Sequence, residues 1–239
     1  MRIVLLSGDR GAGKTTALAR FADAARDAGL RPGGVLQPGV FAADGSKSGS
    51  TWLDPASGAS GEFGSNAREL GGPSWMAWSF SVAGLEAANR AVLDALGRGA
   101  DPVLVDEIGP LELRAGSGLS PALRALEAGA GARAGTDLES PKGTDPESSK
   151  GTDLESPKVT DLESPKGTDL ESPKGTDPGR PLAVVAVRSA LAAELAERLK
   201  AERTIPIDPS RREAAYAELA ALLAPRPSGP GRSGESEAS

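Results

Sequence analysis

An octapeptide near the start of the chain, Gly-Asp-Arg-Gly-Ala-Gly-Lys-Thr at residues 8–15, restricts the possible folds more than any other feature. It fits the pattern GxxxxGK[ST], and an apolar run from Ile3 to Leu6 leads directly into it. From Lys14 onward the apolar residues have helical spacing, and Gly29 marks the expected end of that helix. A strand, a glycine-rich loop and a helix in this order predict a site that binds phosphate groups.

The residue types of this loop suggest how it binds. Glycines let successive backbone N–H groups turn toward a phosphate, and the first helical turn adds unpaired donors and the positive end of its dipole. We expect Lys14 to reach the terminal phosphates of a nucleotide and the Thr15 hydroxyl to hold a magnesium ion. The alternative is a chance match in a glycine-rich chain, which the flanking strand and helix disfavour. The residues predicted to bind nucleotide here are Gly8, Asp9, Arg10, Gly11, Ala12, Gly13, Lys14, Thr15 and Thr16.

Composition limits both the fold and the chemistry. The chain has 239 residues, 38% hydrophobic and 25% charged, which suits one α/β domain with some additional chain. It contains no cysteine and no histidine, which excludes disulfides, thiolate metal sites, Ser-His-Asp hydrolases and His-zinc hydrolases. A general base must then be a carboxylate, a lysine or a metal-bound water. The N-terminal apolar run is too short for a signal peptide and no apolar stretch could span a bilayer, so we expect a cytoplasmic protein.

Residues 135–174 repeat a unit close to Gly-Thr-Asp-Leu-Glu-Ser-Pro-Lys five times. Each copy carries one Asp, one Glu and one Lys, so the repeat supplies −5 of the net charge of −6. The rest of the chain is nearly neutral, and neither nucleic acid nor a membrane is expected as a partner. Because the repeat has few apolar side chains and a Pro in every copy, residues 135–178 are predicted to be a disordered insertion. The alternative is a segment that binds a protein partner or is phosphorylated.

A second chemical signal is the segment DPVLVDEIGPLEL at residues 101–113. Its apolar run from Val103 to Val105 predicts a strand that is buried on both faces of a parallel sheet and ends in two acids. Downstream of a phosphate-binding loop, Asp106 is the predicted metal partner and Glu107 the predicted general base that polarises an attacking water. The alternative is a solvated strand end without a role. The residues predicted to bind nucleotide at this strand end are Asp106, Glu107, Ile108 and Gly109.

The rest of the chain alternates further strands and helices. Helical spacing predicts helices at 85–96, from 119 onward, at 190–199 and at 212–223, and residues 181–188 read as another buried strand. This alternation implies three layers, with a mostly parallel sheet covered by helices on both faces. We expect one domain over residues 1–134 and 179–224, an unstructured tail at 225–239, and a nucleotide at the carboxyl edge of the sheet.

Residues 8–16 and the string DEIGPLEL at 106–113 together resemble the small P-loop nucleoside-triphosphatase family. By this resemblance, residues 34–41 form a second strand and residues 44–54 a hairpin. The resemblance also assigns the last strand to residues 204–208, followed by an arginine at Arg211. It covers roughly residues 1–130 and 181–224 and implies magnesium-dependent hydrolysis of ATP, GTP and other nucleoside triphosphates with a loose base preference.

Some residues leave two interpretations open. The chain has Gln37-Pro38-Gly39 where the family usually carries a Thr or an acidic residue, so substrate choice is not determined. Arg10 either adds charge near the phosphates or points into solvent. Arg188, at its strand end, is either a catalytic arginine finger on the γ-phosphate or a surface residue. One of the clustered aromatic side chains could stack on a purine, or all could pack against the sheet edge. That cluster is Trp75, Trp78 and Phe80.

Three functional classes are compatible with the sequence. The leading class is a stand-alone nucleoside-triphosphatase that uses Lys14, Glu107 and Arg188 for catalysis. The second is a small-molecule or nucleotide kinase, which requires an acceptor pocket and usually an arginine-rich lid over the phosphates. The repeat is the most lid-like stretch of the chain and contains no arginine, which disfavours this class. The third is a slow nucleotide-dependent switch that recruits a protein partner, with the repeat as its point of contact.

Overall fold

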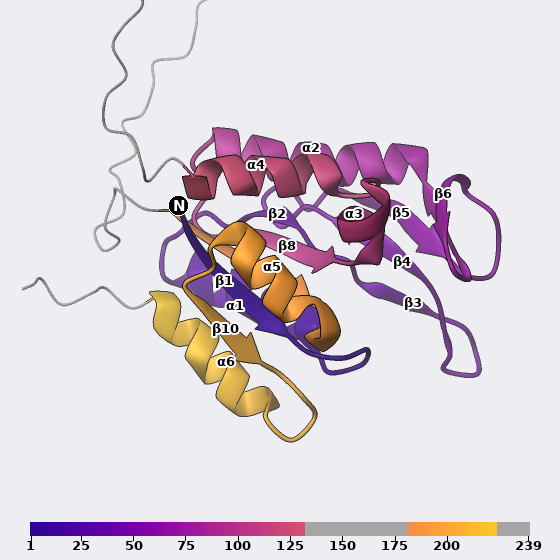
Figure 1. Cartoon of the computed structure of the whole chain (residues 1–239). Helices are drawn as coiled ribbons and strands as arrows, with labels where there is room; N and C mark the ends of the chain where they lie inside the picture. Colours follow the sequence, from indigo (N-terminus) through magenta and orange to yellow (C-terminus); the bar gives the residue numbers. More distant parts are fainter. Residues whose placement is uncertain (132–180, 224–239) are drawn as a thin grey trace, which may run out of the picture. The chain divides into compact units, whose positions relative to one another are not determined.

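The structure is a computed structural model that describes residues 1–131 and 181–223 (Figure 1). These residues belong to one compact unit. The predicted insertion at 135–178 and the predicted tail at 225–239 lie outside the described residues.

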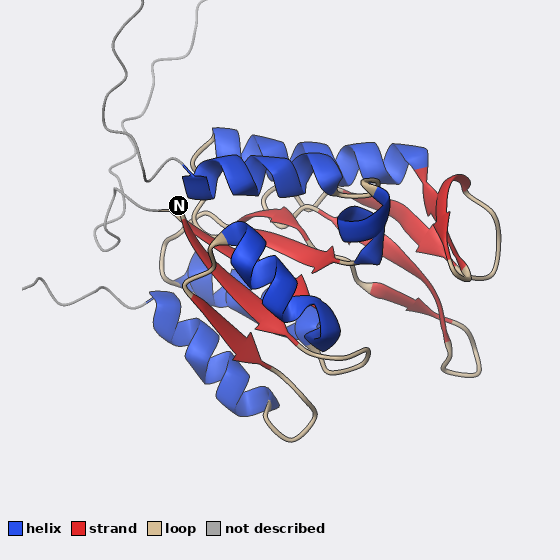
Figure 2. Cartoon of the chain, in the orientation of Figure 1, coloured by secondary structure: helices blue, strands red, loops and turns tan. Residues whose placement is uncertain are grey.

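A five-stranded parallel sheet carries the predicted phosphate-binding loop (Figure 2). Its strand order is β10-β1-β9-β8-β2, and each neighbouring pair is parallel. The strands are β1 (Arg2–Ser7), β2 (Gly33–Val35), β8 (Val103–Ile108), β9 (Leu182–Val187) and β10 (Arg203–Pro206). Because parallel strands end at the same edge, the loop after β1, the acids of β8 and the residue after β9 are brought to one edge.

Helices cover both faces of this sheet, as the sequence predicted. Alternate residues of β1 point to opposite faces, so Ile3 and Leu5 belong to one buried cluster and Val4 and Leu6 to the other. The first cluster includes residues of α2 (Val82–Gly97), α4 (Ser120–Gly131) and α5 (Ala192–Leu199). The second includes residues of α1 (Lys14–Asp27) and α6 (Arg212–Ala220). In Figure 1, α2 and α4 lie side by side over one face.

A second, antiparallel sheet was not predicted beyond the hairpin expected at residues 44–54, which contains its strand β4. Its order is β3-β4-β5-β7-β6, formed by β3 (Gly39–Phe41), β4 (Lys47–Leu53), β5 (Ser60–Ser65), β6 (Gly71–Trp75) and β7 (Trp78–Ser81). The single strand expected at 34–41 is wrong, because β2 lies in the parallel sheet and β3 in the antiparallel one. Pro38 lies between them and cannot donate a backbone hydrogen bond to a ladder. Leu36 and Leu53 exchange two backbone hydrogen bonds of 2.9 Å, which join the two sheets.

The remaining elements are short. They are α3 (Pro110–Ala115) and the 3₁₀ helices η1 (Ser189–Leu191) and η2 (Ala221–Leu223). The predicted helices at 85–96, 190–199 and 212–223 and the one starting near 119 all overlap observed helices. None of the helices in the described part of the chain is both long and apolar enough to cross a bilayer.

Candidate active site

The glycine-rich loop joins β1 to α1 and depends on glycine at two positions. A Cβ atom on Gly8 would lie 2.4 Å from the Ile207 carbonyl oxygen, so a larger residue would force the loop away from β10. Gly13 is the N-cap of α1 with φ of 105°, a conformation that glycine adopts without strain. The first turn of α1 therefore begins directly after the loop, where its free N–H groups and its dipole favour an anion.

Lys14 links the loop to the end of β8. Its side chain is only 7% exposed, and its Nζ donates hydrogen bonds to the Gly8 carbonyl at 2.6 Å and the Asp9 carbonyl at 3.1 Å. The same Nζ lies 3.7 Å from Glu107 Oε2. The ammonium group thus lies between the loop and the second acid of the predicted pair.

Asp106 is the most buried charged group of the site, with 2% exposure. Its Oδ2 accepts a hydrogen bond from the Gln37 backbone N–H at 3.1 Å, and the Thr15 hydroxyl is a second hydrogen-bond partner. Burial raises the pKa of Asp106 to about 6, against the opposing effects of these hydrogen bonds and of Lys14, while Glu107 adds to the increase. The two residues predicted to hold magnesium are therefore in contact.

Glu107 is held between two cations. Arg188, the residue after β9, donates from Nε to Glu107 Oε1 at 3.0 Å, and Lys14 approaches the other carboxylate oxygen. Arg188 remains half exposed. Of the three residues predicted to be catalytic, Glu107 thus contacts both of the others, Lys14 at the start of α1 and Arg188 after β9.

A cleft of about 840 Å³ opens beside these groups. Six cationic side chains line it, against three acidic ones. The cations are Arg10, Lys14, Arg20, Lys47, Arg188 and Arg212, and the acids are Asp9, Glu107 and Glu213. This positive balance suits a polyanion such as a nucleoside triphosphate. Arg10 is exposed at the lining of this cleft.

The other predicted binding residues have different surroundings. Gly11, Gly13, Thr15 and Thr16 line the cleft with Lys14. The side chains of Ile108 and Ala12 are buried in the two apolar clusters instead, which leaves only their backbone to face a ligand. Gly109 lines a smaller cavity next to the cleft.

The sequence did not predict the contact of Arg212 with the loop. Its guanidinium donates to the carbonyl oxygens of Ala12 and Gly11, both at 3.0 Å. The arginine expected near this place was Arg211, which instead pairs with Glu218 at 3.5 Å. The two residues are adjacent at the start of α6, so the orientation of that helix decides which one meets the loop.

Lys47 was also missed as a site residue. It begins β4 in the antiparallel sheet and lines the cleft, with its ammonium 5.5 Å from the centre of the Trp78 ring. Burial lowers the pKa of Lys47, while the charges of Asp106 and Glu107 favour its protonated form. No local sequence pattern indicates this contact, because the antiparallel sheet is what brings Lys47 to the cleft.

A parallel α/β sheet whose first strand enters a glycine-rich loop, with an acidic strand end beside the loop lysine, defines a nucleotide-binding protein of the P-loop class. Residues 3–127, more than half of the chain, match the model of the NTPase family, and the chain belongs to that family. This confirms the family resemblance found in the sequence.

Two solved structures share the fold. THEP1 from the hyperthermophile Aquifex aeolicus is 16% identical, with a TM-score of 0.56 over 93% of this chain and 99% of that one. A human cancer-related nucleoside triphosphatase is also 16% identical, with a TM-score of 0.53 over 93% of this chain and 97% of that one. At this identity the likeness concerns the fold alone. A comparison with curated protein sequences gives no match.

Proposed function

We propose that the protein hydrolyses ATP, GTP and other nucleoside triphosphates to the diphosphate and inorganic phosphate, with water activated by Glu107. The observation that carries the proposal is the position of the Glu107 carboxylate, 3.7 Å from Lys14 Nζ and 3.0 Å from Arg188 Nε at the wall of the cleft. Because the chain has no histidine or cysteine, a carboxylate in this position is the side chain best suited to act as the base.

The loop and its cations have separate roles in this proposal. The backbone N–H groups of residues 8–15 hold the β- and γ-phosphates, and Lys14 leaves its carbonyl partners to bind them. Arg188 stabilises the charge that develops on the γ-phosphoryl group, as a built-in arginine finger does. Lys47, which lines the same cleft, adds a third cation.

Asp106 and Thr15 provide a suitable place for magnesium. A buried carboxylate in contact with a hydroxyl offers the hard oxygen donors that this ion prefers. The described residues include no group of three or more acidic side chains that could hold a metal ion, and magnesium bound with phosphate groups needs only one or two carboxylates. When bound, the ion would neutralise charge on the phosphate oxygens.

Glu107 acts as the general base in this proposal. Its carboxylate accepts a proton from water as the water oxygen bonds to the γ-phosphorus, and the bond from that phosphorus to the bridging oxygen breaks. The diphosphate leaves with the bonding electrons. Arg188 holds the Glu107 carboxylate in place and, as a residue that lines the cleft, would contact the transferred group.

Phosphate release from the purified full chain tests this function. With magnesium and ATP or GTP and no other substrate, we expect continuous formation of the nucleoside diphosphate and inorganic phosphate in equal amounts. Release that requires an added acceptor would instead indicate a kinase. Tight nucleotide binding with very slow release would indicate a switch.

A further inference from the structure

A second cavity, which we call the side chamber, opens off the nucleotide cleft. It has a volume of about 130 Å³ and shares Lys47, Trp78, Glu107 and Arg188 with the cleft. The Glu107 carboxylate therefore stands at the junction of the two spaces. The rest of the chamber wall comes mainly from the antiparallel sheet and from the segment that follows β8.

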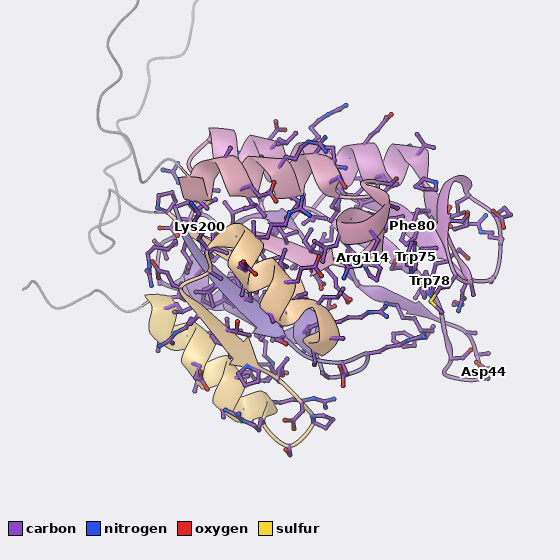
Figure 3. The ribbon with its side chains drawn as sticks, viewed as in Figure 1. Asp44, Trp75, Trp78, Phe80, Arg114 and Lys200 are labelled. Carbon is purple, nitrogen blue, oxygen red and sulfur yellow. The ribbon has the colours of Figure 1, made fainter. Side chains whose placement is uncertain are left out.

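Aromatic rings form much of the chamber wall. Phe63 and Phe80 pack edge to face, with ring centres 5.7 Å apart and planes at 78°. Trp75 and Trp78 complete this wall, and Figure 3 shows Trp75, Trp78 and Phe80 gathered on the antiparallel sheet. Such rings bind an apolar body and fix its orientation.

The chamber is larger than an attacking water requires. One water occupies about 10–15 Å³ of such a volume, whereas an apolar cavity of about 150 Å³ binds benzene. The side chamber therefore has room for an organic molecule of about six non-hydrogen atoms.

The polar groups of the chamber favour an uncharged ligand with a hydroxyl group. Glu107 is already balanced by Arg188 and Lys14, and Lys47 lies at the same junction. Glu112 also lines the chamber, but its carboxylate accepts hydrogen bonds from the Gly109 and Leu119 N–H groups at 2.8 and 2.9 Å. The charged residues of the described lining are two cations and two acids, Lys47, Arg188, Glu107 and Glu112, so the lining has no net charge that would favour an ionic ligand.

We propose that the side chamber binds a small uncharged alcohol with an apolar body and that the protein transfers the γ-phosphoryl group to it. The proposal rests on the proposed function, because it uses the same nucleotide site and the same base. The alcohol oxygen bonds to the γ-phosphorus, its proton passes to the Glu107 carboxylate, and the bond to the bridging oxygen breaks. The products are a phosphate monoester and a nucleoside diphosphate, with no other reactant required.

The division of the γ-phosphoryl group between phosphate ester and inorganic phosphate tests this proposal. The full chain is given magnesium, ATP and 3-methylbutan-1-ol, and ADP, inorganic phosphate and phosphate ester are quantified by chromatography and ³¹P NMR. An alcohol that does not bind, at about 50 mM against about 55 M water, takes about one part in a thousand of the phosphoryl groups. We expect about a tenth of the product as ester, roughly a hundredfold more, because binding places the hydroxyl beside Glu107. Glycerol, of the same size but without an apolar body, should give less ester.

Two variants locate the effect. Trp75 lines the side chamber but not the cleft, so Trp75→Ala should lower the ratio of ester to phosphate about tenfold. Ser50→Val narrows the chamber from β4 and should lower the same ratio. Met76→Ala is the matched control, since Met76 is the next residue, is 90% exposed and does not line the chamber. Circular dichroism verifies that each variant is folded.

The outcomes separate the two proposals. Equal amounts of ADP and phosphate, with ester at the level of an unbound alcohol, overturn the chamber proposal and leave hydrolysis intact. The chamber proposal is also overturned if neither Trp75→Ala nor Ser50→Val changes the ratio of ester to inorganic phosphate. ADP and ester formed only when alcohol is present support the chamber and overturn hydrolysis as the main function. No ADP under any condition overturns both.

Discussion

Replacing Asp106 with Asn should stabilise the metal-free protein, and the gain should depend on pH. Burial raises the pKa of this carboxyl from 3.8 to about 6, so its ionised form is less favourable in the folded protein than in the unfolded chain. The penalty is absent below about pH 3, where the carboxyl is protonated in both states, grows as the pH rises from about 3 to 6, and is complete above about pH 7. At about 1.4 kcal/mol for each tenfold change in the ionisation equilibrium, it amounts to about 3 kcal/mol.

Asn preserves the local geometry. Its carbonyl oxygen can accept the hydrogen bond from the Gln37 N–H, and its amide can donate to the Thr15 hydroxyl. The variant therefore removes the charge without creating a cavity. Its free energy of unfolding relative to the native protein should rise by about 2.4 kcal/mol from pH 4 to pH 7.5.

Urea unfolding followed by circular dichroism measures this difference in buffers that contain a chelator. Asp27→Asn is the surface control, because Asp27 is exposed at the end of α1 and its replacement should change the stability by less than about 0.5 kcal/mol at any pH. If the Asp106→Asn variant and the native protein differ by the same amount at pH 4 and pH 7.5, the reasoning about this buried carboxyl is refuted.

Three further predictions concern the surroundings of the site. Arg188→Ala should slow the chemical step about 10²- to 10³-fold in single-turnover experiments, and an unchanged rate constant would mean that Arg188 has no catalytic role. Arg212→Ala removes two hydrogen bonds to the loop, so titration should show nucleotide binding weakened about tenfold, while Arg211→Ala should leave the dissociation constant unchanged. If the native protein, Arg212→Ala and Arg211→Ala all bind nucleotide with equal affinity, Arg212 has no such role. Deletion of residues 135–174 should leave nucleotide turnover intact, and a folded deletion variant without activity would overturn the assignment of this segment as an insertion.

The sequence predicted those parts of the site that are encoded locally. The loop at 8–15 and the strand that ends in Asp106 and Glu107 each carry their own pattern, and the parallel order of β1, β9 and β8 then brings them together. The position of Arg188 followed from the same rule, because it directly ends a buried strand.

The antiparallel sheet could not be predicted in this way. Its strands between residues 39 and 81 are short and rich in glycine and serine, so they lack a clear apolar alternation and depend on pairing with one another. Lys47 and the side chamber depend on that sheet and were missed with it. Arg212 was missed for a different reason, since a difference of one residue at the start of α6 decides which arginine reaches the loop.

The role of Glu107 as the base is the centre of this account, and Glu107→Gln tests it directly. Nucleotide affinity and the steady-state rate of phosphate release should be measured side by side for this variant and the native protein. The account predicts a dissociation constant within about threefold of the native value and a turnover rate lowered about 10²- to 10⁴-fold, because the amide cannot accept the proton of water. A variant that binds nucleotide and releases phosphate at the native rate would contradict it.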